Sequence, residues 1–197
     1  IVCIPIPGLH NLSNITAAIA VCRMIGVSFK EIKKNIKSLE LPNKRFEFRG
    51  ELNQRIIYDD YAHHPNEIKA TISLARLFIK NQNNTNKDQS KRLIAIFQPH
   101  RFTRVKQFIH EFVQELSKAD VIYLTNIFGA GEKNIQNINS QLIAKLIYKK
   151  NKNVTCFRDN YEIKDKFFKL TKKNDFILNM GAGDCHNLWS ILDEKNT

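Results

Sequence analysis

Apolar residues over most of the chain fall into two alternating patterns, short continuous runs and longer stretches at helical spacing. The continuous runs predict buried strands at residues 93–97, 121–124, 154–157 and 176–180. The stretches that follow them repeat apolar residues every three or four positions and predict helices at 102–116, 140–148, 161–170 and 184–192. Strands that alternate with helices in this way predict an α/β fold with a doubly wound, mostly parallel sheet.

The segment before these repeats has a different rhythm. Two apolar-rich runs around a polar turn predict a β-hairpin at 46–52 and 56–59. A helix that Pro65 opens follows to about residue 80. The polar run 81–91 then predicts a mobile surface loop.

The first forty residues predict a helical pair. The apolar run 1–4 indicates the end of a buried strand, and helical spacing continues from residue 11 to Gly26, which is expected to end that helix. Ser28 with Glu31 three residues later is a capping-box pattern that opens a second helix, to about residue 39.

A break at 41–43, Leu-Pro-Asn, separates the two patterns. We therefore predict two domains, residues 1–44 and residues 45–197. The chain has no starting Met and opens inside an apparent strand, so we expect it to be a fragment of a longer protein.

Composition narrows the function classes. No apolar run approaches the roughly 20 residues that span a bilayer, so we expect no membrane partner. The four cysteines are far apart with no C-x-x-C pair, which favours reduced thiols and a cytoplasmic protein over a disulfide or zinc framework. The net charge of +12 raises nucleic acid as a partner, but the lysines gather in Lys- and Asn-rich stretches without interleaved aromatics, so we expect no nucleic-acid binding.

Four loops at the expected ligand edge carry candidate chemistry, because ligands of doubly wound sheets bind at the carboxyl ends of the strands. They are residues 59–65, 98–104, 126–132 and 181–184. The first, Asp-Asp-Tyr-Ala-His-His-Pro, offers two carboxylates and two histidines. The aspartates have a simpler reading as caps of the helix after Pro65. Adjacent His63 and His64 side chains diverge, so we predict no metal site there.

The other loops add cations and flexible turns. Arg101 and Arg104, beside His100, suit carboxylate or phosphate oxygens, although they could also pair with surface carboxylates. Gly181 and Gly183 allow a backbone to approach a ligand at a helix N-terminus, although glycine is common at any strand-to-helix turn.

These motifs together resemble the Mur ligases, in order and through the whole chain. The resemblance rests on Gly8-x-His10-Asn11-x-x-Asn14, on Arg45 within Lys-Arg-Phe-Glu, on the loop 59–65, and on Phe97-Gln-Pro-His-Arg-Phe-Thr-Arg104. The last motif most resembles the members of the family that join L-alanine to UDP-N-acetylmuramate. Members that attach murein tripeptide to the same sugar nucleotide are the alternative inside the family.

The resemblance implies a fold, a reaction and roles. It implies that residues 1–44 are the end of a central ATP-binding domain and that 45–197 are a C-terminal Rossmann-like ligase domain. The implied cofactors are ATP and Mg²⁺, with acyl-phosphate chemistry on UDP-N-acetylmuramate and L-alanine as partners. By motif, the implied adenine-pocket residues are His10, Asn11 and Asn14; Arg45 would face the phosphates, and Asp60 the ribose or the domain hinge. The implied catalytic residues are His63, His64, Arg101 and Arg104, and the implied substrate-binding residues are Tyr61, His100, Gly181 and Gly183.

The chain departs from the family in one large respect. No glycine-rich phosphate loop with Lys and Ser or Thr occurs in it, and the Mg²⁺ ligands and the UDP-sugar domain are expected in missing N-terminal and central parts. We predict that the chain alone does not make the amide bond. A non-catalytic anion-binding module and a folded remnant remain the alternatives outside the enzyme class.

Overall fold

The computed structural model describes residues 4–40, 42–83, 91–134 and 137–193. It divides into two compact units, residues 1–43 and 44–197, and each is described by itself. No helix within the described ranges is both long and apolar enough to cross a lipid bilayer.

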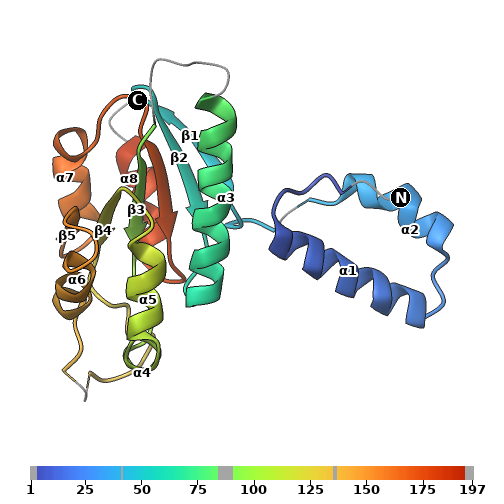
Figure 1. Cartoon of the computed structure of the whole chain (residues 1–197), viewed down its shortest axis with the longest axis horizontal. Coiled ribbons are helices and arrows are strands. Elements are labelled where there is room, and N and C mark those ends of the chain that lie inside the picture. Colours follow the sequence, from blue (N-terminus) through green and yellow to red (C-terminus); the bar gives the residue numbers. More distant parts are fainter. Residues whose placement is uncertain (1–3, 41, 84–90, 135–136, 194–197) are drawn as a thin grey trace. The chain divides into compact units, whose positions relative to one another are not determined.

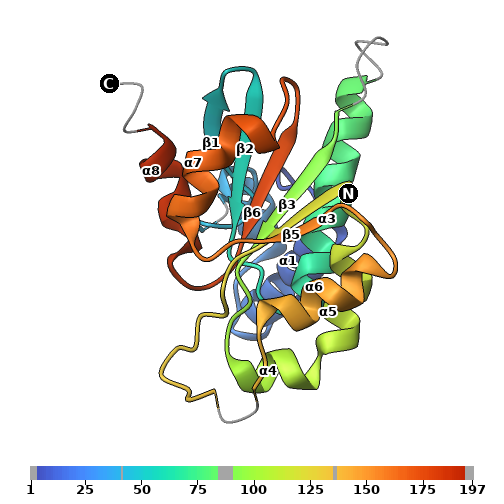
Figure 2. The ribbon, with the colours of Figure 1, turned by 90° about the vertical axis from the view of Figure 1, so that its left-hand side faces the viewer.

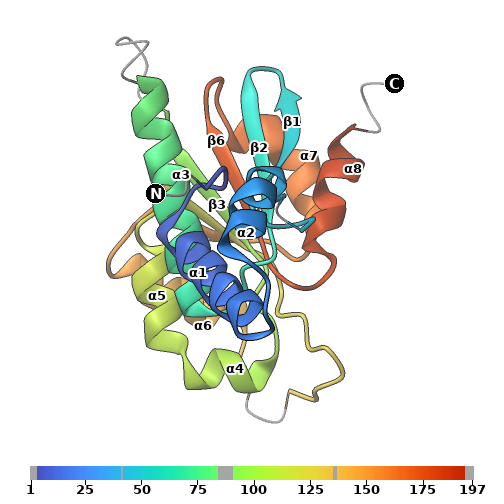
Figure 3. The same cartoon turned by 90° about the vertical axis from the view of Figure 1, so that its right-hand side faces the viewer.

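The first unit is a helical hairpin of α1 (Leu9–Met24) and α2 (Phe29–Asn35), followed by the 3₁₀ turn η1 (Ile36–Ser38) (Figures 1 and 3). Gly26 ends α1 as predicted: at φ 93° it donates its N–H to the carbonyl of Arg23, while Val27 donates to that of Cys22. This pair of bonds is a Schellman motif. The predicted strand end at 1–4 lies outside the described residues except for Ile4, which is irregular.

The predicted capping box is also present in this unit. The Ser28 hydroxyl accepts the backbone N–H of Glu31, and the Glu31 carboxylate accepts the backbone N–H of Ser28. Two of the orphan donors at the start of α2 are thereby satisfied.

The second unit is built on a six-stranded sheet in the order β1-β2-β6-β3-β4-β5. The strands are β1 (Glu47–Leu52), β2 (Arg55–Asp60), β3 (Leu93–Phe97), β4 (Val121–Leu124), β5 (Val154–Cys156) and β6 (Phe176–Met180). The β1–β2 pair is antiparallel and all other pairs are parallel, which confirms the predicted fold class. Asn53 and Gln54 both have positive φ, the geometry of a tight type I′ hairpin turn.

Helices cover both faces of this sheet (Figures 1 and 2). One face is packed by α3 (Pro65–Asn83), α5 (Ile109–Leu116) and α6 (Ser140–Tyr148), and the other by α7 (Asn160–Leu170) and α8 (Asn187–Asp193). Every residue of β3 and β6 is buried, as expected of strands that carry a core on each side. Two separate apolar clusters result, one on each face.

The predicted bounds of two helices and of the polar run 81–91 need correction. The helix expected at 102–116 is broken into α4 (Phe102–Gln107) and α5 at Phe108, whose ring lies 4.8 Å from that of His64 on a distant segment. The helix expected at 184–192 begins as the 3₁₀ turn η2 (Asp184–His186) before α8. The polar run 81–91 begins inside α3, which continues to Asn83, and its residues 84–90 lie outside the described part of the chain.

Candidate functional site

The four predicted loops meet at one edge of the sheet and are fastened by backbone hydrogen bonds. Gly181 donates to the carbonyl of Asp60 at 3.1 Å, and Gln98 donates to that of Met180 at 3.0 Å. Arg101 donates to the carbonyl of Phe128 at 2.8 Å. The expected convergence at the carboxyl ends of the parallel strands therefore holds.

Asp60 is enclosed rather than open to a ligand. Only 5% of it is exposed, and its two carboxylate oxygens accept the N–H groups of Phe46 and Ala62 at 2.8 and 2.7 Å. Burial raises the pKa of Asp60 against the opposing effect of these bonds. The contacts fasten the start of the second unit to the end of β2, and the expected role of Asp60 at the ribose or the domain hinge stays a prediction.

Asp59 lies on the other side of β2, in a buried polar cluster. Its Oδ1 accepts the Asn179 side-chain amide at 2.8 Å, and its Oδ2 lies 3.5 Å from Nε of Arg49. Burial raises the pKa of Asp59 to about 6, because desolvation of the carboxylate outweighs the hydrogen bond from Asn179.

The simpler reading of both aspartates as helix caps is wrong. The Glu67 carboxylate accepts the backbone N–H groups of His63 and His64, at 3.0 and 3.1 Å, and so satisfies the start of α3. Burial opposes the ionisation of Glu67, but these two bonds and nearby cationic groups keep its pKa below the ordinary value. Glu67 lies three residues after His64, which is the spacing of a capping box. The motif is hard to recognise in the sequence because His is an unusual residue at the cap position.

His63 and His64 diverge, as predicted. The His63 ring lies 5.6 Å from the His100 ring, whereas the His64 ring packs against Phe108 and its Nδ1 accepts the N–H of Asn66. Only His63 therefore joins the cluster at the loop edge, and His64 supports the start of α3. The described residues contain no group of three or more His, Cys, Asp or Glu side chains that could hold a metal ion.

Hydrogen-bond partners fix the tautomers of the two facing imidazoles. Nδ1 of His63 lies 2.8 Å from the carbonyl oxygen of Tyr61 and 3.4 Å from the carboxylate of Glu67, which can only accept, so Nδ1 carries a proton and the neutral ring has its lone pair on Nε2. Nδ1 of His100 lies 3.2 Å from Nη1 of Arg104, which can only donate, so the neutral His100 carries its proton on Nε2. Burial, followed by the charges of His63, Arg104 and Arg101, lowers the pKa of His100 and favours this neutral form.

Arg101 and Arg104 differ in their setting. Arg104 is half-buried against His100, while Arg101 is exposed and has φ 66°, a left-handed conformation that is costly for a residue with a side chain. The bond from Arg101 N–H to Phe128 and the parallel bridge between His100 and Phe128 hold this turn in place.

Two further residues that sequence reasoning missed complete this edge. Glu132 accepts both the N–H and the hydroxyl of Thr103, at 3.0 and 2.7 Å, and so ties the loop after β4 to the first turn of α4. Phe128 stacks on the His100 ring with centroids 5.6 Å apart and planes 9° apart. Neither contact has a sequence signal, because both join residues about thirty positions apart.

Gly181 and Gly183 lie where neighbouring atoms leave no space for a side chain. A Cβ on Gly181 would lie 2.8 Å from Sγ of Cys185, and a Cβ on Gly183 would lie 2.3 Å from Oε1 of Gln98. Both glycines are thus required by close packing around Gln98, and their expected contact with substrate stays a prediction.

Arg45 and Tyr61 lie beside the histidine loop. The Arg45 guanidinium lies 5.7 Å from the centre of the Tyr61 ring and 3.8 Å from the carboxylate of Glu67. The Arg45 side chain is 43% exposed, so its charge is available to an anion from solvent.

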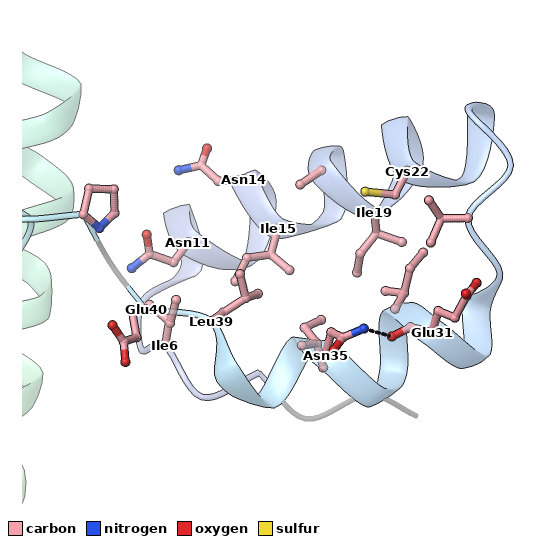
Figure 4. Close-up of a pocket in the computed structure, with 15 residues that line it drawn as sticks. Ile6, Asn11, Asn14, Ile15, Ile19, Cys22, Glu31, Asn35, Leu39 and Glu40 are labelled. Atoms are coloured by element: carbon pink, nitrogen blue, oxygen red, sulfur yellow. Dashed lines mark hydrogen bonds between the residues drawn. The ribbon is translucent and has the colours of Figure 1, made fainter.

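The remaining predicted residues belong to the first unit, where an apolar pocket of about 460 Å³ lies between α1 and α2 (Figure 4). Asn11 and Asn14 line it beside apolar residues such as Ile15 and Ala18. Asn11 is buried and donates its amide to the carbonyl of Pro7, at 2.7 Å, while Asn14 is exposed. His10 is exposed and does not line the pocket.

Known proteins are similar to this chain in sequence and in architecture. The family model described as "Mur ligase, glutamate ligase domain" matches residues 44–183. The chain belongs to the Mur ligase family. The resemblance inferred from the motifs is thereby confirmed.

Two relatives of this Mur ligase chain bear the same name, UDP-N-acetylmuramate–L-alanine ligase. The protein of Prochlorococcus marinus subsp. pastoris (strain CCMP1986 / NIES-2087 / MED4) is 83% identical over 100% of the chain, and that of Synechococcus sp. (strain CC9311) is 41% identical over 98% of it. The chain spans 42% and 40% of the lengths of these two relatives.

Solved structures agree on the fold. UDP-N-acetylmuramate–alanine ligase of Thermotoga maritima matches 98% of the chain, and 39% of its own, with a TM-score of 0.73 at 22% identity. A murein peptide ligase of Psychrobacter arcticus 273-4 matches 97% of the chain, and 38% of its own, with a TM-score of 0.68 at 23% identity. At such identities these likenesses bear on the fold of the Mur ligase chain alone.

The residues of this Mur ligase chain fit one part of ATP. The amides of Asn11 and Asn14 beside an apolar wall suit a flat purine, whose edges hydrogen-bond and whose faces are apolar. The sequence has no glycine-rich phosphate loop, and the described residues offer no Mg²⁺ cluster. The described residues therefore suit the adenine end of the nucleotide, and they offer neither a glycine-rich loop for its phosphates nor a carboxylate cluster for Mg²⁺.

Proposed function

We propose that the protein to which this chain belongs is an ATP-dependent ligase that joins L-alanine to UDP-N-acetylmuramate. Residues 1–44 would be the end of its ATP-binding domain and residues 45–197 its C-terminal domain. The observation that carries the proposal is the 83% identity, over the whole chain, to a relative named for this reaction. The cluster of His63, His100 and Arg104 supplies chemistry that the reaction needs.

The reaction requires activation of a carboxylate, since a carboxylate is a poor acyl donor. ATP supplies the phosphoryl group that makes the muramate carboxyl an acyl phosphate, and the amine nitrogen of L-alanine then displaces phosphate as the amide bond forms. The amine enters as an ammonium ion and has to lose a proton before it can attack. Negative charge also gathers on the phosphate oxygens as the bond breaks.

The loop edge can meet both needs. In the neutral ring of His63 the lone pair lies on Nε2, so we assign to this nitrogen the proton of the ammonium. His100 carries a proton on Nε2 and lies beside Arg104, so these two can donate hydrogen bonds to a carboxylate or phosphate oxygen. The exposed Arg101 and Arg45 add positive charge from two flanking loops.

The sequence has no glycine-rich phosphate loop, so we expect no amide formation by the 197-residue chain alone. The longer protein, extended at its N-terminus, should release phosphate from ATP only when both UDP-N-acetylmuramate and L-alanine are present. Release that needs murein tripeptide in place of L-alanine would move the assignment to the recycling type of ligase. Turnover by the 197-residue chain would contradict the assignment of the phosphate site to another segment.

A matched pair of variants tests the histidine roles in the longer protein. His63→Asn removes the base and is expected to lower kcat about 10²–10⁴-fold, the usual contribution of general base catalysis. His64→Asn keeps a residue that caps helices well and is expected to leave kcat within about tenfold. Equal losses in the two variants would sink the assignment of the base to His63.

A further inference from the structure

Glu67, in the first turn of α3, joins two segments of the candidate site. Its Oε2 accepts the backbone N–H groups of His63 and His64, and the same oxygen lies 3.4 Å from Nδ1 of the His63 ring. Its Oε1 lies 3.8 Å from Nη1 of Arg45. One carboxylate therefore contacts both the ring to which the proton transfer is assigned and a guanidinium beside that ring.

The Glu67 side chain is ionised at neutral pH. Burial raises its pKa, but the two backbone N–H groups and the charges of His63 and Arg45 outweigh burial and hold the pKa below its ordinary value. The side chain is 34% exposed, so solvent screens the charge only in part. A negative charge thus lies beside His63 at the pH at which the reaction would run.

On its other side, His63 has cationic neighbours. Its ring lies 5.6 Å from that of His100, which Arg104 contacts at 3.2 Å. Burial, followed by the charges of His63 and of two arginines, lowers the pKa of His100, so a further positive charge is disfavoured at this edge. A base that becomes an imidazolium here needs a carboxylate close by to offset the charge it gains.

We propose that Glu67 is a positioning residue for the ligase reaction and acts through His63. When Nε2 of His63 takes the proton of the ammonium ion, Nδ1 keeps its own proton and the ring becomes positively charged. The Glu67 carboxylate holds the ring at Nδ1 and stabilises this charge, and the proton stays on the imidazole. The role rests on the proposed function, because it requires His63 to be the base.

The same contacts allow a purely structural role for Glu67 as the cap of α3, and glutamine separates the two roles. A glutamine oxygen still accepts backbone N–H groups but carries no charge. Glu162 offers a matched control, because it accepts the backbone N–H of Arg158 at 2.7 Å at the start of α7. Glu67→Gln and Glu162→Gln therefore make the same change at the starts of two helices.

The first experiment measures kinetics of the longer protein. Glu67→Gln is expected to lower kcat about 10–100-fold at an unchanged KM for L-alanine, the size of one hydrogen bond to a charged group. Glu162→Gln is expected to leave kcat unchanged. Combined with His63→Asn, the Glu67→Gln change should lower kcat no further, because the group through which it acts is gone. Equal fold losses with and without His63 would overturn the proposal.

The second experiment tests the contact in the 197-residue chain without ligase activity. Because coupling between two groups is reciprocal, an imidazolium that Glu67 stabilises must in turn lower the pKa of Glu67. His63→Asn is expected to raise that pKa, measured from the side-chain carboxyl signal in ¹³C NMR, whereas His64→Asn should leave it below its ordinary value. An equal rise in the two variants, or a rise in neither, would overturn the proposal.

The outcomes distinguish this role from the proposed function. No phosphate release by the unmodified longer protein with UDP-N-acetylmuramate and L-alanine would overturn the proposed function, and the role of Glu67 with it. Release that Glu67→Gln leaves unchanged would overturn the role of Glu67 alone. Circular dichroism verifies that each variant is folded, and the NMR titration keeps Glu67 intact, so it does not depend on the folding of Glu67→Gln.

Discussion

The two units of the chain differ in how much of their apolar surface they bury. The second unit closes an apolar cluster on each face of its sheet, with Phe97, Phe112 and Phe167 almost fully inaccessible to solvent. In the described part of the first unit, only Asn11, Ile15 and Ile36 are buried, while Leu9 and Met24 are more than four-fifths exposed.

The difference shows that well-formed helix caps and turns do not by themselves create a buried apolar core. The first unit has a complete capping box and a Schellman motif, and its helices are correctly started and stopped. Yet short helices are marginal in water unless an apolar face is packed, and its pocket of about 460 Å³ marks an apolar face that its two helices do not fill. Stability should therefore reside in the second unit.

The largest expected effect is that of a core substitution, and it tests whether stability resides in the second unit. Phe112→Ala should lower the free energy of unfolding of the second unit by about 3–5 kcal/mol, because it opens a cavity in a fully packed site. Ile15→Ala should change it by less than about 0.5 kcal/mol, the scale of changes outside a packed core. The single tryptophan, Trp189, lies in α8 and reports denaturant unfolding of the second unit alone. A large shift of that transition by Ile15→Ala would break the comparison.

A second test uses the buried charge of the second unit. Because the pKa of Asp59 is raised to about 6 in the folded state, the folded protein holds this proton more tightly than the unfolded chain. The contribution of Asp59 to stability is therefore fully present below pH about 4 and is lost as the pH rises to about 6, by about 3 kcal/mol.

Asp59→Asn removes this titration and keeps a similar shape. The wild-type protein should lose about 3 kcal/mol relative to the variant between pH 4 and pH 7, measured by Trp189 fluorescence in urea at several pH values. A constant difference between the two proteins across that range would contradict the raised pKa.

The smallest expected effect sharpens the comparison by making one kind of change in both units. Ser28→Ala removes the cap of α2 and Asn139→Ala removes that of α6, whose side chain accepts the N–H of Leu142. Each should cost its own helix about 1 kcal/mol. Circular dichroism should show lost helix for Ser28→Ala without a change in the Trp189 transition, whereas Asn139→Ala should shift that transition. Equal shifts of the transition would mean that the two units unfold together.

Much of the fold could be predicted because its signals are local. The buried strands β3 and β6 appear as continuous apolar runs, and Gly26, Ser28 and Glu31 mark helix ends within a few residues of themselves. The alternation of strand and helix fixed a parallel sheet, and the rule for parallel sheets then placed the candidate loops at one edge. The divergence of His63 and His64 needed only their adjacency.

Other features depended on residues that are distant in sequence. The helix break at Phe108 accompanies a ring contact with His64, and the buried cluster of Asp59 requires Asn179 from β6. The tautomers of His63 and His100 follow from partners that only the assembled loops provide.

The sequence by itself thus determined the element types, the fold class, the family and the loops that meet at the candidate site. Only the tertiary structure decided which histidine faces His100, which aspartate is enclosed by backbone donors and how strongly burial shifts a pKa. The physical reason is that helix caps and apolar runs depend on neighbours a few positions away. Desolvation and side-chain pairing depend on which distant segments come into contact.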